Sequence, residues 1–316
     1  MSARVARKKT RGMRTTEVPI GSIVVGIDAA RSSGCALDWA ADRAALDHRD
    51  LVLVHGTGHP TVDAPSAGIG RPDPFQMYDD MASAGRAILY RATTRVVLRQ
   101  PDLSVHQAVL RVDPGPALVE LSERAAMIVV GSRGRGHMLS LLLGSVSEDV
   151  AGQAACPLVV VRPEHDVRPR DGVLVGTDGS PDSVGVLETA FHEAWLRRVH
   201  LTVVHTVWDA VPVTAPGHAG GTDEPTAAVR RSLADAVAPL AERYPEVRVA
   251  IEVGRGTPSE FLVEAAADQD LVVVGHHQRH GFDRVMHGSV ALSVLEHATT
   301  PVVIVPVGRE PGLGHP

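Results

Sequence analysis

The feature that most limits how this chain can fold is an internal repeat. Short runs of valine, leucine and isoleucine that end at an acidic residue, a histidine or a glycine occur in the same order in both halves of the 316 residues. The matched positions are Asp28 with Asp178, His55 with His205, Gly131 with Gly275, Gly144 with Gly288 and Ser145 with Ser289. A repeated order of motifs over this length indicates a tandem duplication of one structural unit.

Each half alternates predicted strands and helices. In the first half we predict strands at residues 23–27, 51–55, 104–112, 127–130 and 157–161, and helices at 33–47, 75–98 and 116–125, with a further helix beginning at Ser145. Near-continuous apolar strands separated by helices are typical of a parallel sheet with helices on both faces. We therefore predict an α/β fold with domains at residues 19–163 and 171–308, preceded by a basic tail at residues 1–18.

Composition excludes several classes of protein. The hydrophobic content of 44% is enough for well-filled cores, and no apolar run is long enough to span a membrane. A formal net charge of −6 argues against a general affinity for nucleic acid. Cys35 and Cys156 are spaced neither as a metal site nor as a redox pair, which favours a reducing compartment such as the cytoplasm.

The N-terminal tail is strongly basic. Its charged residues are Arg4, Arg7, Lys8, Lys9, Arg11 and Arg14. Such a tail is compatible with an electrostatic arm for nucleic acid or a membrane surface, or with the start of a signal peptide. The next apolar run, residues 20–27, contains two glycines and ends at Asp28, so it is better interpreted as a strand. We interpret the tail as disordered.

A glycine-rich segment follows the fourth predicted strand. Gly131, Gly134 and Gly144 are spaced Gly-x2-Gly-x9-Gly, and Ser145 follows directly. Glycines let backbone N–H groups approach an anion closely, and a helix N-terminus adds partial positive charge. Ser145 with Glu148 is predicted to form a capping box that fixes the helix start. We interpret the segment as a phosphate-binding loop, and the alternative is a surface loop without a ligand.

Two commoner phosphate-binding motifs do not fit. A Walker loop needs Gly-Lys-Ser or Gly-Lys-Thr, and the chain's only lysines are Lys8 and Lys9 in the tail. A Gly-x-Gly-x-x-Gly fingerprint between strand and helix is missing as well. Enzyme chemistry has little support, because the chain lacks a Gly-x-Ser-x-Gly elbow and the folded part has no lysine for a Schiff base.

Taken together, these motifs resemble the universal stress protein family over nearly all of residues 20–307. The glycine spacing is similar to the family's ATP-binding signature, and it occurs together with strands that end at Asp28 and His55 and a strand that begins at Pro157. The resemblance implies two open five-stranded parallel sheets of order 3-2-1-4-5, of the adenine nucleotide alpha-hydrolase-like kind. It further implies roles in stress tolerance, dormancy or low-oxygen survival, and halves that pack as an intrachain pseudo-dimer.

ATP, with or without Mg, is the cofactor that this resemblance implies. In the first half the implied contacts are Asp28 and Gly56 with the adenosine, Val130 and Gly131 with the ribose, and Arg133, Gly134, Gly144, Ser145, Val146 and Ser147 with the phosphates. The weaker set in the second half is Asp178, Thr206, Gly275, Gly288, Ser289 and Val290. The family's Asp-Gly-Ser after the first strand is Asp28-Ala29-Ala30 here, whereas Asp178-Gly179-Ser180 is intact.

The second half departs from the pattern in its glycine-rich segment. Gln278 replaces the middle glycine, and Leu292 stands where an acidic residue would complete a capping box. We therefore expect ATP to be held mainly by the first half. Histidines crowd this segment at His276, His277, His280 and His287. They lack a helical i, i+4 pair and cysteine partners, so we expect no metal site, and we interpret His55 and His205 as structural.

Two classes of function remain open. In the first, the protein is a nucleotide-dependent regulator that binds ATP and acts on an unknown protein partner. In the second, it is a nucleotide-free stress scaffold that works through protein contacts, and a slow ATPase is a third, weaker option. Neither a membrane nor a specific nucleic acid is expected as a partner, and a homodimer stays open.

The last apolar run of each half carries a prediction about assembly. The family order places residues 158–161 and 302–305 at the edges of the two sheets. An exposed apolar edge strand invites pairing and is normally covered. We therefore predict that these two strands pair or pack against each other within one chain.

Overall fold

The structure is a computed structural model that describes residues 17–58, 74–132, 143–163, 172–207, 224–277 and 290–307. Strands and helices alternate in the first half in the predicted order. Its elements are β1 (Ile23–Gly26), α1 (Arg31–Leu46), β2 (Leu51–Gly56), α2 (Pro74–Arg99), β3 (Val105–Leu110), α3 (Pro114–Ser122), β4 (Met127–Gly131), α4 (Ser145–Gln153) and β5 (Leu158–Val161).

The second half repeats this succession with two short 3₁₀ turns added. Its elements are β6 (Val173–Gly176), η2 (Pro181–Ser183), α5 (Val184–Arg197), β7 (Leu201–Val207), α6 (Glu224–Arg243), β8 (Val249–Arg255), α7 (Pro258–Ala265), η3 (Ala266–Asp268), β9 (Leu271–His277), α8 (Val290–His297) and β10 (Val302–Val307). The duplication inferred from the motifs is thus a duplication of the fold.

The strands of both halves form one ten-stranded sheet of order β3-β2-β1-β4-β5-β10-β9-β6-β7-β8. Each half keeps the expected order 3-2-1-4-5, and its own strands are parallel. The halves join where β5 runs antiparallel to β10, with Val159 opposite Val303. The predicted pairing of the two closing strands is confirmed, and the two predicted sheets are the halves of a single one.

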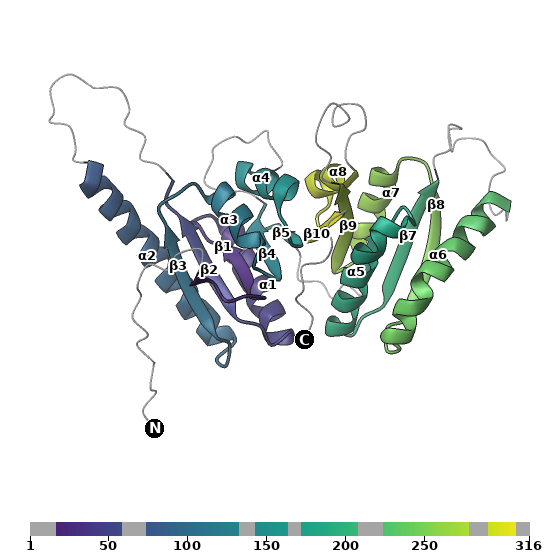
Figure 1. Ribbon diagram of the computed structural model, residues 1–316, viewed down its shortest axis with the longest axis horizontal. Coiled ribbons are helices and arrows are strands. Elements are labelled where there is room, and N and C mark those ends of the chain that lie inside the picture. The colour runs from purple at the N-terminus through teal and green to yellow at the C-terminus, as the bar shows by residue number, and fades with distance from the viewer. Residues whose placement is uncertain are drawn as a thin grey trace, which may run out of the picture.

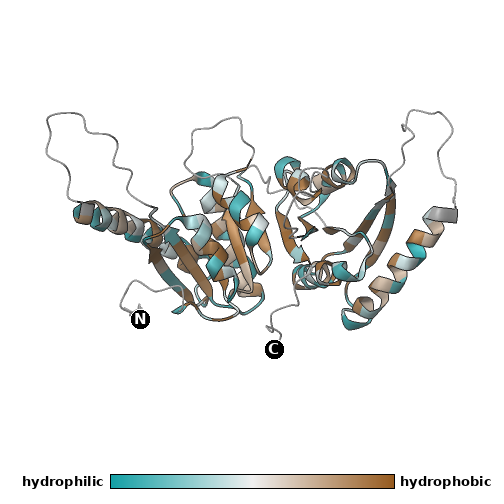
Figure 2. Cartoon of the chain, turned by 45° about the horizontal axis from the view of Figure 1, so that its top comes forward, coloured by the Kyte–Doolittle hydropathy of each residue, from teal (hydrophilic) through white to brown (hydrophobic). Residues whose placement is uncertain are grey.

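Helices cover both faces of the sheet, and each layer runs across both halves (Figures 1 and 2). One buried cluster joins the sheet to α1, α2, α5 and α6, and a second joins it to α3, α4, α7 and α8. Because side chains alternate along a strand, Val159 and Val303 belong to the first cluster, whereas Leu158 and Ile304 belong to the second. The paired strands at the seam therefore carry apolar side chains on both faces of the sheet.

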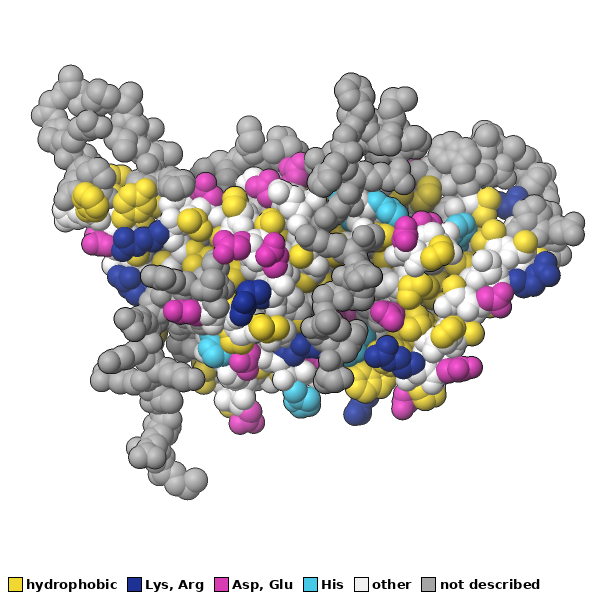
Figure 3. Space-filling view, in the orientation of Figure 1, with side chains coloured by type: hydrophobic (Ala, Val, Ile, Leu, Met, Phe, Trp, Pro, Cys, Tyr) yellow, Lys and Arg dark blue, Asp and Glu magenta, His cyan; other side chains and the backbone are white. Residues whose placement is uncertain are grey.

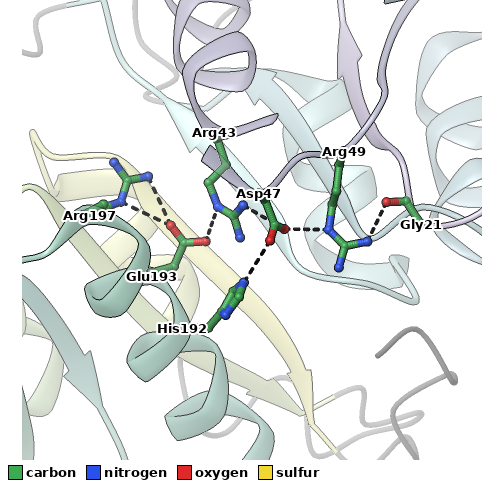
Figure 4. A network of polar contacts seen from close by, with 7 residues as sticks. All are labelled: Gly21, Arg43, Asp47, Arg49, His192, Glu193 and Arg197. Carbon is green, nitrogen blue, oxygen red and sulfur yellow. Dashed lines mark hydrogen bonds and ion pairs between the residues drawn. The ribbon is translucent and has the colours of Figure 1, made fainter. Parts of the chain in front are cut away.

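A buried polar network crosses this seam between α1 and α5 (Figure 4). The guanidinium of Arg43 donates from Nε to Glu193 Oε1 at 2.6 Å, and both side chains are buried. Arg43 Nη1 also lies 2.9 Å from Asp47 Oδ2, and Asp47 Oδ1 lies 3.3 Å from His192 Nε2. Arg197 completes the network, with its Nη2 3.1 Å from the second oxygen of Glu193. Each half thus contributes one donor side chain and one carboxylate to the contacts across the seam.

A second polar contact joins the halves on the opposite face of the sheet. Arg162, directly after β5, is buried, and its Nη2 donates to the carbonyl oxygens of Leu295 and Glu296 at 2.5 and 2.6 Å. These carbonyls belong to the last turn of α8 and lack helical donors, so a cation there satisfies them.

One local prediction is wrong. Helix α4 does begin at Ser145, but its N-cap is Gly144 and no side chain caps it. The amide of Glu148 donates to the carbonyl of Gly144. Ser145 is already the first helical residue, so Glu148 lies one position beyond the place from which a capping box reaches back.

The stability that the α1–α5 network provides is expected to fall in acid. Burial alone would raise the pKa of Glu193, but the charges of Arg43 and Arg197 outweigh burial and lower that pKa below its ordinary value of 4.5. Burial likewise opposes ionisation of Asp47, and His192 and Arg43 lower its pKa regardless. A carboxyl group whose pKa is lowered by folding stabilises the fold above its unfolded pKa, and this contribution is lost as the pH falls.

We therefore expect the free energy of unfolding in urea to decline between about pH 5 and pH 3. The matched variant is Arg43→Met with Glu193→Leu, which removes the central pair and should show a shallower decline. Equal pH slopes for the two proteins would contradict this assignment.

Candidate nucleotide site at the strand ends

Three neighbouring strands end at the residues that the sequence singles out. In the sheet β1 lies between β2 and β4, with Gly26 opposite Val54 and Val25 opposite Val129. The chain leaves these strands at Asp28, Gly56 and Gly131, so the three positions meet at one edge of the sheet. In open α/β sheets this carboxyl edge is where ligands bind.

Asp28 is held in a turn that leads into α1. Its Oδ1 accepts a hydrogen bond of 2.8 Å from the backbone N–H of Ala30, and its own N–H donates to Ser33 Oγ at 3.0 Å. The side chain is half-buried, and within the described residues no hydrogen bond reaches Oδ2. A carboxylate fixed at one oxygen can accept from a ligand hydroxyl or amine with the other.

The glycines at this edge have tight surroundings. A Cβ on Gly131 would stand 2.6 Å from the carbonyl carbon of Ser32, and one on Gly56 would stand 2.9 Å from the Cα of Pro114. No side chain fits at either place without backbone movement. Close packing against α1 and α3 therefore explains both glycines even without a ligand.

Helix α4 begins beside the end of β4. The amide of Gly144 donates to the carbonyl of Ser132 at 2.9 Å, and Ser147 Oγ donates to the carbonyl of Gly131 at 3.0 Å. Ser145 is exposed in the first turn, where backbone N–H groups lack helical acceptors and carry partial positive charge. The helix start is thus fixed at the carboxyl edge, and the hydroxyl of Ser147 serves to hold it there.

The remaining first-half residues fall into two groups. Val130 is buried in the core and Val146 packs against it, so only their backbone groups face the edge. Arg133 and Gly134 lie outside the described residues. The sequence did not single out Ser132, which is 1% exposed and whose hydroxyl has no hydrogen-bond partner in the described part of the chain. Its only signal was its place directly after Gly131.

The second half has its own arrangement at the equivalent edge. Asp178 Oδ1 accepts from the amide of Ser180 at 2.9 Å, and Oδ2 lies 3.9 Å from His277 Nε2. Burial alone would raise the pKa of Asp178, but the hydrogen bonds from Ser180 and the nearby His277 lower it. A carboxylate engaged in this way is less available to a ligand than Asp28.

The other second-half positions differ in surroundings as well. Thr206 stands where the first half has Gly56, and a Cβ on Gly275 would meet Val307 at 2.8 Å and Val186 at 2.9 Å. Val290 is the first described residue of α8 and is partly exposed. Gly288, Ser289 and Gln278 lie outside the described residues. Of the predicted second-half residues, Asp178, Thr206, Gly275 and Val290 therefore lie within the described part of the chain.

The described residues show no metal cluster and no membrane-spanning helix. Among the described residues no three His, Cys, Asp or Glu side chains are grouped as metal ligands. No described helix is long and apolar enough to cross a membrane. On the face in Figure 3, acidic and basic side chains are interspersed, and no large basic surface forms on the described residues there.

The fold and the strand-end site define a tandem, doubly wound α/β protein, and comparison with known proteins identifies its family. The family model described as "Universal stress protein family" matches twice, at residues 19–162 and 170–306. The chain belongs to the universal stress protein family. A universal stress protein of Mycobacterium tuberculosis is 35% identical over 288 residues, which cover 89% of this chain and 96% of the relative.

One solved structure supports the fold. A universal stress protein from Archaeoglobus fulgidus has a TM-score of 0.66 at 18% identity and covers 90% of this chain and 98% of its own. Another from the same organism, in complex with dAMP, is 25% identical, covers 43% of this chain and 97% of its own, and has a TM-score of 0.32.

Proposed function

We propose that this universal stress protein binds ATP at the carboxyl edge of its first half and works as a nucleotide-dependent regulator in stress response or dormancy. The observation that carries the proposal is that Asp28 follows β1 and Gly131 ends the neighbouring β4, where Ser147 of α4 donates to the carbonyl of Gly131. The carboxylate suits ribose hydroxyls or the adenine amine, and the helix start suits phosphates. Family membership supports a role in stress.

Each residue has a distinct proposed role. Asp28 and the backbone of Gly56 flank the adenosine, and the backbone at Val130 and Gly131 faces the ribose. The amides at the start of α4 contact the phosphates. Arg133 neutralises phosphate oxygens and Gly134 lets the loop approach them, and Mg²⁺ would be held through the phosphates.

The second half is proposed to bind nucleotide more weakly. Thr206 replaces Gly56, Asp178 is engaged by Ser180 and approached by His277, and Gln278 replaces the middle glycine. The intact Asp178-Gly179-Ser180 offsets part of this difference. We further propose that regulation is exerted on a protein partner in the cytoplasm, where the free thiols of Cys35 and Cys156 suit a reducing environment.

The first test asks whether the protein carries nucleotide at all. The full chain is purified without added nucleotide and denatured, and the released small molecules are separated and identified. An adenine nucleotide in stoichiometric amount is expected. Its absence, together with no heat of ATP binding, would favour the nucleotide-free scaffold. Steady release of ADP and phosphate from added ATP would favour the slow ATPase.

The second test asks which half binds. Calorimetric titration with ATP is compared for wild type, Gly134→Gln and Gly288→Gln, the last of which changes the second-half glycine that corresponds to Gly144. Loss of one charge-assisted hydrogen bond costs roughly 1.5–3 kcal/mol, so Gly134→Gln should weaken binding about tenfold or more. Gly288→Gln should leave the main site unchanged. If Gly288→Gln abolishes binding while Gly134→Gln does not, the assignment of the halves is reversed.

A further inference from the structure

A histidine ring extends the pairing of the first two strands at the point where their backbones separate. The main-chain bond from Ile27 N–H to the carbonyl of Val54 measures 2.8 Å. Directly beyond it, His55 Nδ1 lies 2.7 Å from the carbonyl oxygen of Ile27. A carbonyl oxygen only accepts, so Nδ1 carries the proton and donates it.

The second half repeats this arrangement. The amide of Thr177 donates to the carbonyl of Val204 at 3.0 Å, and His205 Nδ1 lies 2.9 Å from the carbonyl oxygen of Thr177. The donor and acceptor are 28 residues apart in both halves. Two independent copies of the same bond show that it belongs to the fold and not to one accidental contact.

The bond lies where the proposed nucleotide site opens. Beyond this point β2 continues beside β3, with Gly56 opposite Leu110 and the amide of Thr57 donating to the same Leu110. The chain after β1 instead turns toward α1, and Asp28 directly follows Ile27. His55 therefore ties Ile27 to β2 immediately before the two chains part on either side of the site.

The ring itself is confined by α2. A Cβ on Gly85 would stand 2.7 Å from His55 Cδ2 and 3.3 Å from a methyl of Val109. Gly85 is buried, so the ring fills the space that a larger residue there would take. The donor nitrogen consequently has little freedom to move away from the Ile27 carbonyl.

We propose that His55 is a positioning residue of the nucleotide site, whose Nδ1–H fixes the place of Asp28 opposite Gly56. The inference rests on the proposed binding of ATP by the first half. His205 plays the equivalent part for Asp178, and it therefore provides an internal control.

The experiment titrates ATP into the full chain carrying one of four substitutions, with urea unfolding recorded for each. His55→Leu removes the donor, and the dissociation constant for ATP should rise about tenfold. Asparagine carries a side-chain N–H the same number of bonds from the backbone as Nδ1, so His55→Asn should stay within about threefold of wild type. His55→Gln holds its N–H one bond farther out and should behave like the leucine variant. His205→Leu should leave the main site unchanged.

Each outcome decides between the claims. Wild-type affinity in a folded His55→Leu protein would overturn the positioning role. Equal weakening by His55→Asn and His55→Leu would overturn it too. So would a loss of affinity in His205→Leu that equals the loss in His55→Leu. If His55→Leu does not fold, the difference between His55→Asn and His55→Gln decides. Wild-type protein that binds no ATP would instead refute the proposed function, and the inference would fall with it.

Discussion

Replacing Glu193 with alanine should lower the free energy of unfolding by about 3–5 kcal/mol, because the change removes the carboxylate to which the buried Arg43 Nε donates and leaves only Asp47 beside the guanidinium. Arg43 is 4% exposed and Glu193 1% exposed, so water reaches neither. Burial opposes the charge on Arg43, and the neighbouring carboxylates of Glu193 and Asp47 raise its pKa. Because an arginine guanidinium keeps its proton in proteins, Arg43 stays charged when Glu193 is lost. Urea unfolding at neutral pH measures the effect.

Two comparisons make this result specific. Asp42→Ala breaks the ion pair between Asp42 and Arg99. The side chain of Arg99 is 48% exposed and that of Asp42 is 39% exposed, so the free energy of unfolding should fall by only about 0–1 kcal/mol. The double variant Arg43→Met with Glu193→Leu removes both charges and should recover most of the stability that Glu193→Ala loses. If Asp42→Ala destabilised as much as Glu193→Ala, burial would not be the reason for the effect.

The second large effect is expected at Arg162, on the other face of the seam. Arg162→Met keeps an unbranched apolar stem but removes the donor to the carbonyls of Leu295 and Glu296. Hydrogen bonds from a charged donor contribute about 1.5–3 kcal/mol each, and a loss of about 2–4 kcal/mol is expected after partial relaxation of α8. Thermal or urea unfolding of the full chain provides the measurement.

A matched control for Arg162 exists in the second half. Arg230 Nη1 also donates to a backbone carbonyl, that of Ile251 at 2.7 Å, but this contact is exposed. Water replaces the lost bond in Arg230→Met, so a cost of about 1 kcal/mol or less is expected. Similar losses for both variants would mean that the buried contact at α8 has no special weight.

The strands could be predicted because they depend on short-range patterns, whereas their order was implied by the resemblance to the universal stress protein family. Val/Ile runs mark buried parallel strands wherever they occur, and the repeated motifs fix the correspondence between the halves. The β5–β10 pairing could be predicted because the family order places both apolar strands at sheet edges, and such edges are normally covered.

The polar contacts could not be predicted in the same way. Arg43 and Glu193 are 150 residues apart and lie on helices whose charged residues look, in the sequence, like ordinary solvated faces. The capping box failed because the motif is displaced by one residue from the true N-cap. His55 was recognised as structural, but its acceptor, the carbonyl of Ile27, is a backbone atom that no side-chain pattern reveals. Arg133 and Gly134 remain predictions.

The network of Figure 4 also shows a difference in charge between the two halves. Arg43 and Glu193 occupy equivalent places in their halves, as do Asp47 and Arg197, because each pair has the same spacing as Asp28 and Asp178. The charges at both places are reversed between the copies. An assembly of two first halves in this geometry would set arginine against arginine, and one of two second halves would bury glutamate against glutamate. Like charges across a buried interface are strongly disfavoured. The charges at this seam therefore favour the pairing of a first half with a second half over the pairing of two like halves.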